Sequence, residues 1–311
     1  NLTTTYNISL SYLSQKGVMK FNTDKYDRYT LHSNITTNVT KWWRVRSNIL
    51  FTRSVNDQPY RFTAGQYDAW FYLLRWPRWY PYADYEGKPF RSAVTDIKAG
   101  NRESLTSTYL RANLGTELNP LKNMTVNFDY TFGYVNDATK RNGGRVTAYD
   151  MFATAPFSNY KDLYGSTHDR VIQQSSYTLQ NIFKAYATYK FALQEKHDFK
   201  FMAGFDAETR EALGHYSERR GLISLNMPEI ALTTGDQYSS STWGSFHNDF
   251  AAAGFFGRIN YDFLQRYLFE FNARYDGSSR FPQGKKWAFF PSFSAGWRTS
   301  EEKFMDWARP S

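Results

Sequence analysis

Aromatic and charged residues are interleaved in one polar stretch, residues 67–88, and have the chemistry to hold an extended ligand. Its candidate contact residues are Trp70, Tyr72, Arg75, Trp76, Arg78, Trp79, Tyr80, Tyr82 and Asp84. Aromatic rings stack on sugar faces or peptide side chains, while Arg and Asp supply directional hydrogen bonds. The stretch therefore predicts ligand binding. The alternative is that its rings brace the loop against neighbouring loops or a partner, with residues 67–74 forming a short helix.

Further candidates of the same kind lie in or beside other polar links. They are Arg219, Arg220, Trp243, Asp276 and Arg280.

Catalytic and metal-binding patterns are not found. The five histidines are dispersed (His32, His168, His197, His215 and His247), and we see no carboxylate–histidine spacing typical of zinc or iron sites. Asp206 and Glu208 are two residues apart, so on a strand they share a face and fit a polar wall better than a glycosidase pair. The sequence predicts no metal, no cofactor and no enzyme activity.

The segment 254–297 indicates which secondary structure positions these residues. In residues 267–276 the odd positions are apolar, whereas Glu270, Asn272, Arg274 and Asp276 share the other side, a period of two that predicts a strand with two unlike faces. A two-residue link, Leu264–Gln265, precedes this strand, and a longer polar link follows it.

The same pattern recurs along the chain. It predicts an all-β fold of about ten strands, joined by links that are alternately short and long, as in a transmembrane antiparallel β-barrel. Short turns of bacterial barrels lie in the periplasm, so the long links, about 55–103, 136–173, 211–241 and 276–286, are expected outside the cell. A soluble β-sandwich also alternates, but its strands are shorter and its links do not sort by length.

Bulk composition agrees with a barrel. Aromatics make up 19% of 311 residues, yet the mean hydropathy is −0.64. No run approaches the roughly 18 apolar residues of a spanning helix, whereas a barrel strand needs only alternate apolar positions. The net charge of +9 is scattered over strand faces and loops and not clustered, so no nucleic-acid partner is expected. The absence of cysteine removes disulfide and thiolate–metal frameworks.

Two segments carry a family resemblance. Tyr275-Asp-Gly-Ser-Ser-Arg-Phe-Pro-Gln-Gly-Lys-Lys-Trp-Ala-Phe-Phe-Pro-Ser-Phe-Ser-Ala-Gly-Trp-Arg-Thr-Ser-Glu-Glu302 resembles a hallmark segment of the SusC/RagA-like TonB-dependent transporters of Gram-negative outer membranes. Thr4-Thr-Tyr-Asn-Ile-Ser-Leu-Ser-Tyr12 resembles the opening of a strand in the same family.

The resemblance implies a barrel of about 22 strands around a plug domain. It also implies import of oligosaccharides or peptides across the cell outer membrane, energy from the TonB complex, and a SusD-like surface lipoprotein as partner. Residues 1–311 would form part of a single barrel domain, facing outer-membrane lipid and lipopolysaccharide, with the plug domain and remaining strands absent.

The ends of the sequence suggest an internal piece of that barrel. No signal peptide opens the chain, and it closes on a polar segment after a strand. We therefore expect the first and last strands to pair with remaining segments of the same transporter. The alternatives are a self-contained ten-stranded enzyme of the surface-protease type, with Asp162, His168 and Asp169 in one outer loop, or a passive porin or adhesin. Pairing between the first and last strands would favour these alternatives.

Overall fold

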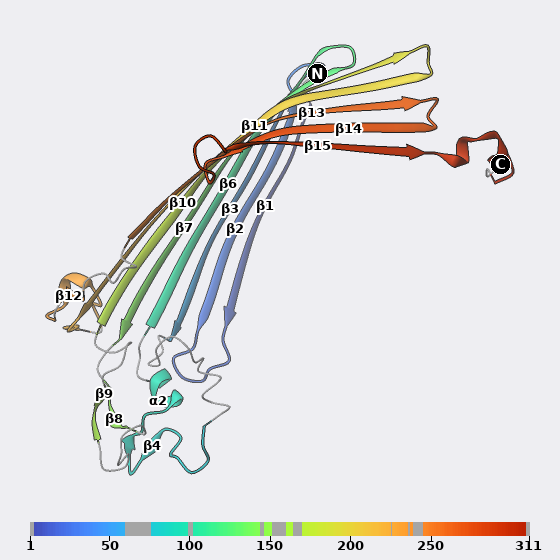
Figure 1. The fold of residues 1–311 in the computed structure, drawn as a ribbon. Coiled ribbons are helices and arrows are strands. Elements are labelled where there is room, and N and C mark those ends of the chain that lie inside the picture. Colours follow the sequence, from blue (N-terminus) through green and yellow to red (C-terminus); the bar gives the residue numbers. More distant parts are fainter. Residues whose placement is uncertain are drawn as a thin grey trace.

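The computed structural model describes residues 3–59, 76–98, 102–143, 146–150, 160–163, 170–224, 226–235, 237–238 and 245–308, and within them the fold is almost entirely β (Figure 1). Ten long strands form the main sheet: β1 (Thr3–Lys16), β2 (Lys25–Asn38), β3 (Trp43–Pro59), β6 (Arg102–Leu121), β7 (Met124–Gly143), β10 (Arg170–Leu193), β11 (His197–Arg220), β13 (Ser245–Phe263), β14 (Tyr267–Ser278) and β15 (Trp287–Trp297). The smaller elements are β4 (Asp84–Tyr85), β5 (Lys88–Pro89), α2 (Ala93–Lys98), β8 (Val146–Tyr149), β9 (Tyr160–Leu163), η1 (Ile230–Leu232), β12 (Gln237–Tyr238), η2 (Thr299–Glu301) and η3 (Lys303–Ala308).

The ten strands follow one another across a single antiparallel sheet in sequence order. Figure 1 shows this sheet strongly curved, with the short turns towards one end and most of the long connections at the other. The prediction of an all-β fold of about ten strands is therefore confirmed. Among the described residues no helix is long and apolar enough to cross a membrane.

Two of the short links are tight turns built without glycine. Leu264 and Gln265 have φ values of 55° and 56°, and Gln194 and Glu195 have 53° and 55°. Two successive positive φ angles are typical of the type I′ turn, whose twist matches that of the strands it joins. The predicted link at Leu264–Gln265 thus has the geometry of a hairpin.

The strands extend further than the alternation predicted. β13 begins at Ser245, and β11 continues to Arg220, so the connection between them is 221–244 and not 211–241. The other long connections are likewise shorter, at 60–101, 144–169 and 279–286. Apolar and polar residues no longer alternate where both faces of a strand contact polar surroundings. Neighbouring strands still offer backbone partners there, so the backbone hydrogen bonds between strands continue.

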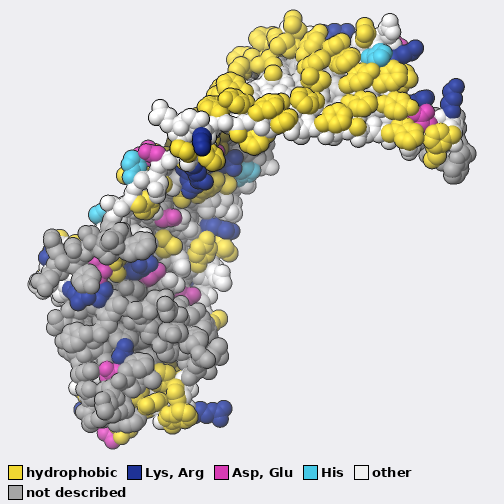
Figure 2. Space-filling model, in the orientation of Figure 1, with side chains coloured by type: hydrophobic (Ala, Val, Ile, Leu, Met, Phe, Trp, Pro, Cys, Tyr) yellow, Lys and Arg dark blue, Asp and Glu magenta, His cyan; other side chains and the backbone are white. Residues whose placement is uncertain are grey.

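One face of the sheet is apolar across all ten strands. The register aligns Leu10 with Leu31, Leu31 with Phe51, and Phe271 with Phe293, so many apolar side chains meet across neighbouring strands. Figure 2 shows hydrophobic side chains gathered over the part of the sheet where β13, β14 and β15 lie.

The height of the apolar face can be read along β15. Trp287 and Trp297 bound it, and ten residues of about 3.3 Å each make about 33 Å of strand. At a tilt of roughly 40° that corresponds to about 25 Å, the height of the lipid-facing band of a barrel flanked by aromatic girdles. Phe293, midway between them, is 68% exposed. The sheet is a transmembrane barrel wall whose apolar side chains need lipid around them.

The two outer strands of the sheet do not meet. Within the described part of the chain, β1 pairs only with β2, and β15 pairs only with β14. The sheet is therefore an open section of a barrel wall.

Candidate functional site

The first long connection is organised around Phe90, which is completely buried. Tyr80 stacks on its ring at a centroid distance of 5.9 Å, and Trp76 meets it edge-on at 6.4 Å. The indole Nε1 of Trp76 also donates a hydrogen bond to the carbonyl oxygen of Pro81 at 3.0 Å. Trp76 and Tyr80 therefore pack on the buried centre of their own loop.

A second set of residues in the same loop faces outward. Trp79 is 80% exposed and Tyr82 is 54% exposed, and Arg78 and Asp84 are also exposed. These four side chains combine two ring faces with a cation and a carboxylate on a braced scaffold. This is the part of the predicted contact set that the structure leaves accessible to a ligand.

The loop is fixed to the next long connection. The amide of Arg91 donates to the carbonyl oxygen of Tyr149 at 2.9 Å, and its guanidinium pairs with Asp150 at 3.0 Å. The ring of Tyr85 meets that of Tyr149 edge-on at 5.5 Å. The nearby Glu86 carboxylate raises the pKa of Tyr85 above its usual value, so this phenol stays neutral. Two connections far apart in sequence thus form one surface.

Arg219 and Arg220 lie at the outer end of β11 and differ in exposure. Arg219 is half-buried and donates from Nη2 to the carbonyl oxygen of Gly235 at 3.4 Å, which ties the strand to the connection that follows. The side chain of Arg220 is exposed, and its carbonyl oxygen accepts a hydrogen bond from the amide of Gly235 at 3.0 Å. Arg220 is therefore the more exposed of the two.

Asp276 and Arg280 do not form a pair with each other. Asp276 accepts from Arg274 at 2.9 Å, and the same guanidinium reaches Asp206 at 2.9 Å. Arg280 instead places its guanidinium 4.7 Å from the centre of the Phe250 ring. Asp276 is thus part of the wall, while Arg280 is an exposed cation at its outer rim.

The polar face of the sheet carries alternating charges that are mostly paired across strands. The ion pairs are Arg44–Glu117, Arg46–Asp129, Arg258–Glu270 and Arg274 with Asp206 and Asp276. Towards the short turns, a groove of about 660 Å³ runs over β10, β11, β13, β14 and β15, and Lys190, Lys200 and Glu270 line its polar side. This face is a charged wall.

Some predicted site residues lie outside the described part of the chain. These are Trp70, Tyr72, Arg75 and Trp243, together with the short helix expected at 67–74.

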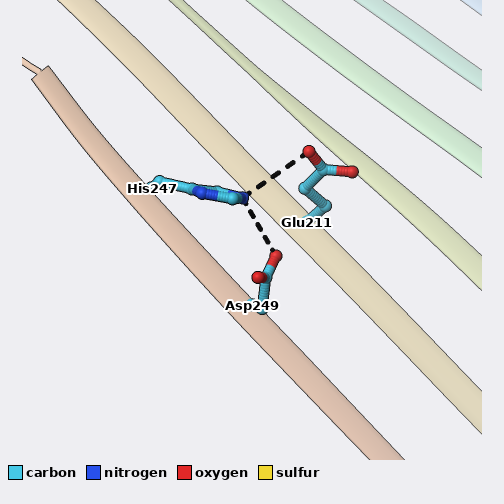
Figure 3. Close-up of side chains that lie close together, drawn as sticks. All are labelled: Glu211, His247 and Asp249. Atoms are coloured by element: carbon cyan, nitrogen blue, oxygen red, sulfur yellow. Dashed lines mark ion pairs between the residues drawn. The ribbon is translucent and has the colours of Figure 1, made fainter.

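The search for metal ligands missed one cluster. The structure brings Glu211 of β11 together with His247 and Asp249 of β13, as Figure 3 shows, and the register places all three on the apolar side of the sheet. The signal in the sequence is a histidine and an aspartate two residues apart on one strand, which share a face. The third ligand comes from the neighbouring strand and could be found only with the register of the sheet.

Comparisons with known proteins connect this geometry to a family. No model of a protein family matches the sequence. The TonB-dependent receptor SusC of Bacteroides thetaiotaomicron is 30% identical over 183 residues, covering 58% of this chain and 17% of that protein. The TonB-dependent receptor P3 of Formosa agariphila is 25% identical over 321 residues, covering 96% of this chain and 29% of that protein. The chain therefore spans less than a third of the length of these relatives.

Solved structures agree on the fold. A structure of the RagAB peptide transporter matches with a TM-score of 0.74 at 22% identity, over 97% of this chain and 33% of that one. The same importer in its closed-closed state matches with a TM-score of 0.75 at 21% identity. By sequence and by fold, the chain resembles the SusC/RagA-like TonB-dependent outer-membrane transporters, as a section of the wall of their barrel.

Proposed function

We propose that the chain forms part of the barrel wall and the external loops of a TonB-dependent, SusC-like importer in the cell outer membrane. The observation that carries this is the open ten-stranded sheet, apolar on one face and charged on the other, with an unpaired edge at β1 and another at β15 among the described residues. A backbone polar group left unpaired in lipid costs several kcal/mol. Strands from the remaining segments of the same transporter would complete the barrel.

In this arrangement the long connections 60–101, 144–169, 221–244 and 279–286 lie outside the cell, and the short turns lie in the periplasm. The charged face would line the lumen around a plug domain, and the groove beside Lys190, Lys200 and Glu270 would receive part of it. The TonB complex would act through regions of the transporter beyond this section. Outer-membrane lipid and lipopolysaccharide would cover the apolar face.

The cargo we propose is an oligosaccharide or a peptide, held in part by the exposed side chains of the first connection. Trp79 and Tyr82 offer ring faces for stacking on sugars or on peptide side chains, and Arg78 and Asp84 offer hydrogen bonds. Arg220 and Arg280 are secondary contacts, and Trp70, Tyr72, Arg75 and Trp243 remain predictions. A SusD-like lipoprotein would close over the same surface.

The rival function is a closed ten-stranded barrel that acts as an enzyme, a passive porin or an adhesin. Such a barrel requires a ladder between β1 and β15, and the described strands form none. The side chains of the outer-loop candidates Asp162, His168 and Asp169 lie outside the described part of the structure.

The test is uptake by cells that produce the complete transporter. Cells would be given a labelled oligopeptide mixture or a labelled oligosaccharide mixture, with and without a functional TonB complex. We expect uptake of one class that stops when TonB is removed, and co-purification of a surface lipoprotein with the barrel. Uptake of both classes at equal rates without TonB would support a passive porin instead.

A further inference from the structure

Three side chains on the outer, apolar side of the sheet form a compact group above the lipid-facing band. Glu211 of β11 lies directly opposite Asp249 of β13, and His247 lies opposite Leu213. All three occupy positions in step with the apolar residues of their own strands, so they project to the same side as Phe205 and Phe255. Figure 3 shows the imidazole of His247 pointing between the two carboxylates.

The group lies beyond the hydrocarbon. The register places Ala253 at the level of Gly277, and Gly277 at the level of Trp287, the outer aromatic boundary of the apolar face. Asp249 is four residues further along β13 and His247 is six, which is about 13–20 Å of strand. The side chains of Glu211, His247 and Asp249 are 45%, 56% and 71% exposed. They are open to solvent and to ions.

The distances between the three donor atoms suit a metal ion bound by all three side chains. His247 Nε2 lies 3.2 Å from Asp249 Oδ1 and 3.6 Å from Glu211 Oε1, and the three donor atoms lie within 4.8 Å of one another. Donors held at about 2.0–2.2 Å from a tetrahedral zinc ion are roughly 3.4 Å apart. Small rotations of exposed side chains would bring all three atoms to that spacing, while the paired strands fix their starting points.

The charges favour a cation at this place. Two carboxylates directly opposite each other on neighbouring strands repel and destabilise the pair. Among the described residues, His247 is the only ion-pair partner of Glu211 and of Asp249. One imidazole carries at most one positive charge and therefore cannot neutralise both carboxylates, whereas a divalent cation neutralises both.

We infer that Glu211, His247 and Asp249 form a binding site for a divalent transition-metal ion such as Zn²⁺ on the outer surface of the barrel. One imidazole nitrogen and two carboxylate oxygens suit Zn²⁺ better than the all-oxygen ligand sets of Mg²⁺ and Ca²⁺. Three protein ligands leave a coordination position open to water or to an anionic group outside the barrel. The metal would also join the outer parts of β11 and β13.

The first test is zinc binding to the complete transporter, purified in detergent and freed of metal with a chelator. Titration with ZnCl₂ is expected to show one site that His247→Ala removes and that Glu211→Gln and Asp249→Asn weaken. Loss of an outer-shell partner alone costs about 10–100-fold in metal affinity, so loss of a ligand is expected to cost at least about 100-fold. His197→Gln is the matched control, since His197 lies at the opposite end of β11 and bonds to Tyr261.

A wild-type protein that binds no more zinc than the Glu211/His247/Asp249 triple variant would overturn the site, and so would equal loss in the His197 control. X-ray absorption of the zinc-loaded wild type gives a test that needs no variant. We expect one imidazole nitrogen and two or more oxygens around the zinc. A shell with no imidazole, or with several, contradicts the assignment.

Discussion

The ring of Trp76 meets the ring of Phe90 edge-on, with centroids 6.4 Å apart, while Trp79, three residues further, is 80% exposed. Two tryptophans in one short stretch therefore have different environments. The first packs on the buried centre of the loop, and the second exposes its ring at the surface of the loop.

The first prediction concerns these two tryptophans. Trp79→Ala should weaken binding of the cargo by roughly 2–12-fold, since a stacked ring contributes about 0.5–1.5 kcal/mol beyond its burial. It should leave the loop intact, as judged by limited proteolysis of the complete transporter. Trp76→Ala should instead make the loop sensitive to protease. If Trp79→Ala loosens the loop and leaves affinity unchanged, both tryptophans are structural.

The second prediction concerns the two faces of β15. Phe293→Arg should reduce the yield of assembled barrel, because an arginine at the midplane of the lipid face costs about 2–4 kcal/mol. Ser292→Arg is the matched control, since Ser292 is the adjacent residue, is also exposed and points to the charged face. Heat-modifiable migration on gels measures assembly. Equal loss in the two variants would remove the face assignment.

The third prediction concerns a buried ion pair at the outer ends of β10 and β11. Arg170 pairs with Glu218, their side chains are 9% and 6% exposed, and Tyr216 donates to the same carboxylate at 2.6 Å. Glu218→Gln removes the negative charge of a buried ion pair and should cost about 3–5 kcal/mol. The control Glu117→Gln breaks the more exposed pair with Arg44 and should cost about 0–1 kcal/mol.

Hydrogen exchange at the outer ends of β10 and β11 measures the third prediction. Protection there should fall in Glu218→Gln and remain unchanged in Glu117→Gln. Similar exchange in both variants would show that the buried pair is no more important than a surface one.

The fourth prediction concerns the effect of acid pH on the connection after β11. Glu229, in the connection after β11, accepts a hydrogen bond from Lys140 of β7, and this contact lowers the pKa of Glu229 below its ordinary value of 4.5. A lowered carboxyl pKa stabilises the folded connection above the ordinary pKa, and that stabilisation is lost as the pH falls through the lowered value. We expect protection of residues 226–235 from exchange, corrected for intrinsic rates, to hold from pH 7 to about 5 and to fall below 4.5.

The comparison for this prediction is Lys140→Met. It removes the ammonium that lowers the pKa, so protection of the connection should be reduced already at pH 7 and should change less with acid. A wild-type protein with the same protection on both sides of pH 4.5 would show that the contact does not hold the connection.

The sequence predicted the sheet and its two faces because alternation with a period of two is a local property, visible in runs such as 267–275. It did not predict that Trp76 and Tyr80 pack on Phe90, because that depends on how a long connection folds back on itself. The cluster of Glu211, His247 and Asp249 was missed for a related reason. Its members are joined by the register between two strands, and register is set by the whole sheet.

The central claim is that β1 and β15 are open edges that other segments of the transporter complete. Residues 1–311 contain no cysteine, so this section adds no background of its own to disulfide trapping. In the complete transporter, cysteines at Leu10 and Leu31, which the register pairs, should cross-link readily, since paired strand positions lie within disulfide reach. Cysteine at Leu10 combined in turn with cysteine at Phe289, Phe293 or Trp297 should give no cross-link. Efficient trapping of Leu10 with any of these three positions would mean that β1 meets β15 and that the ten strands close on themselves.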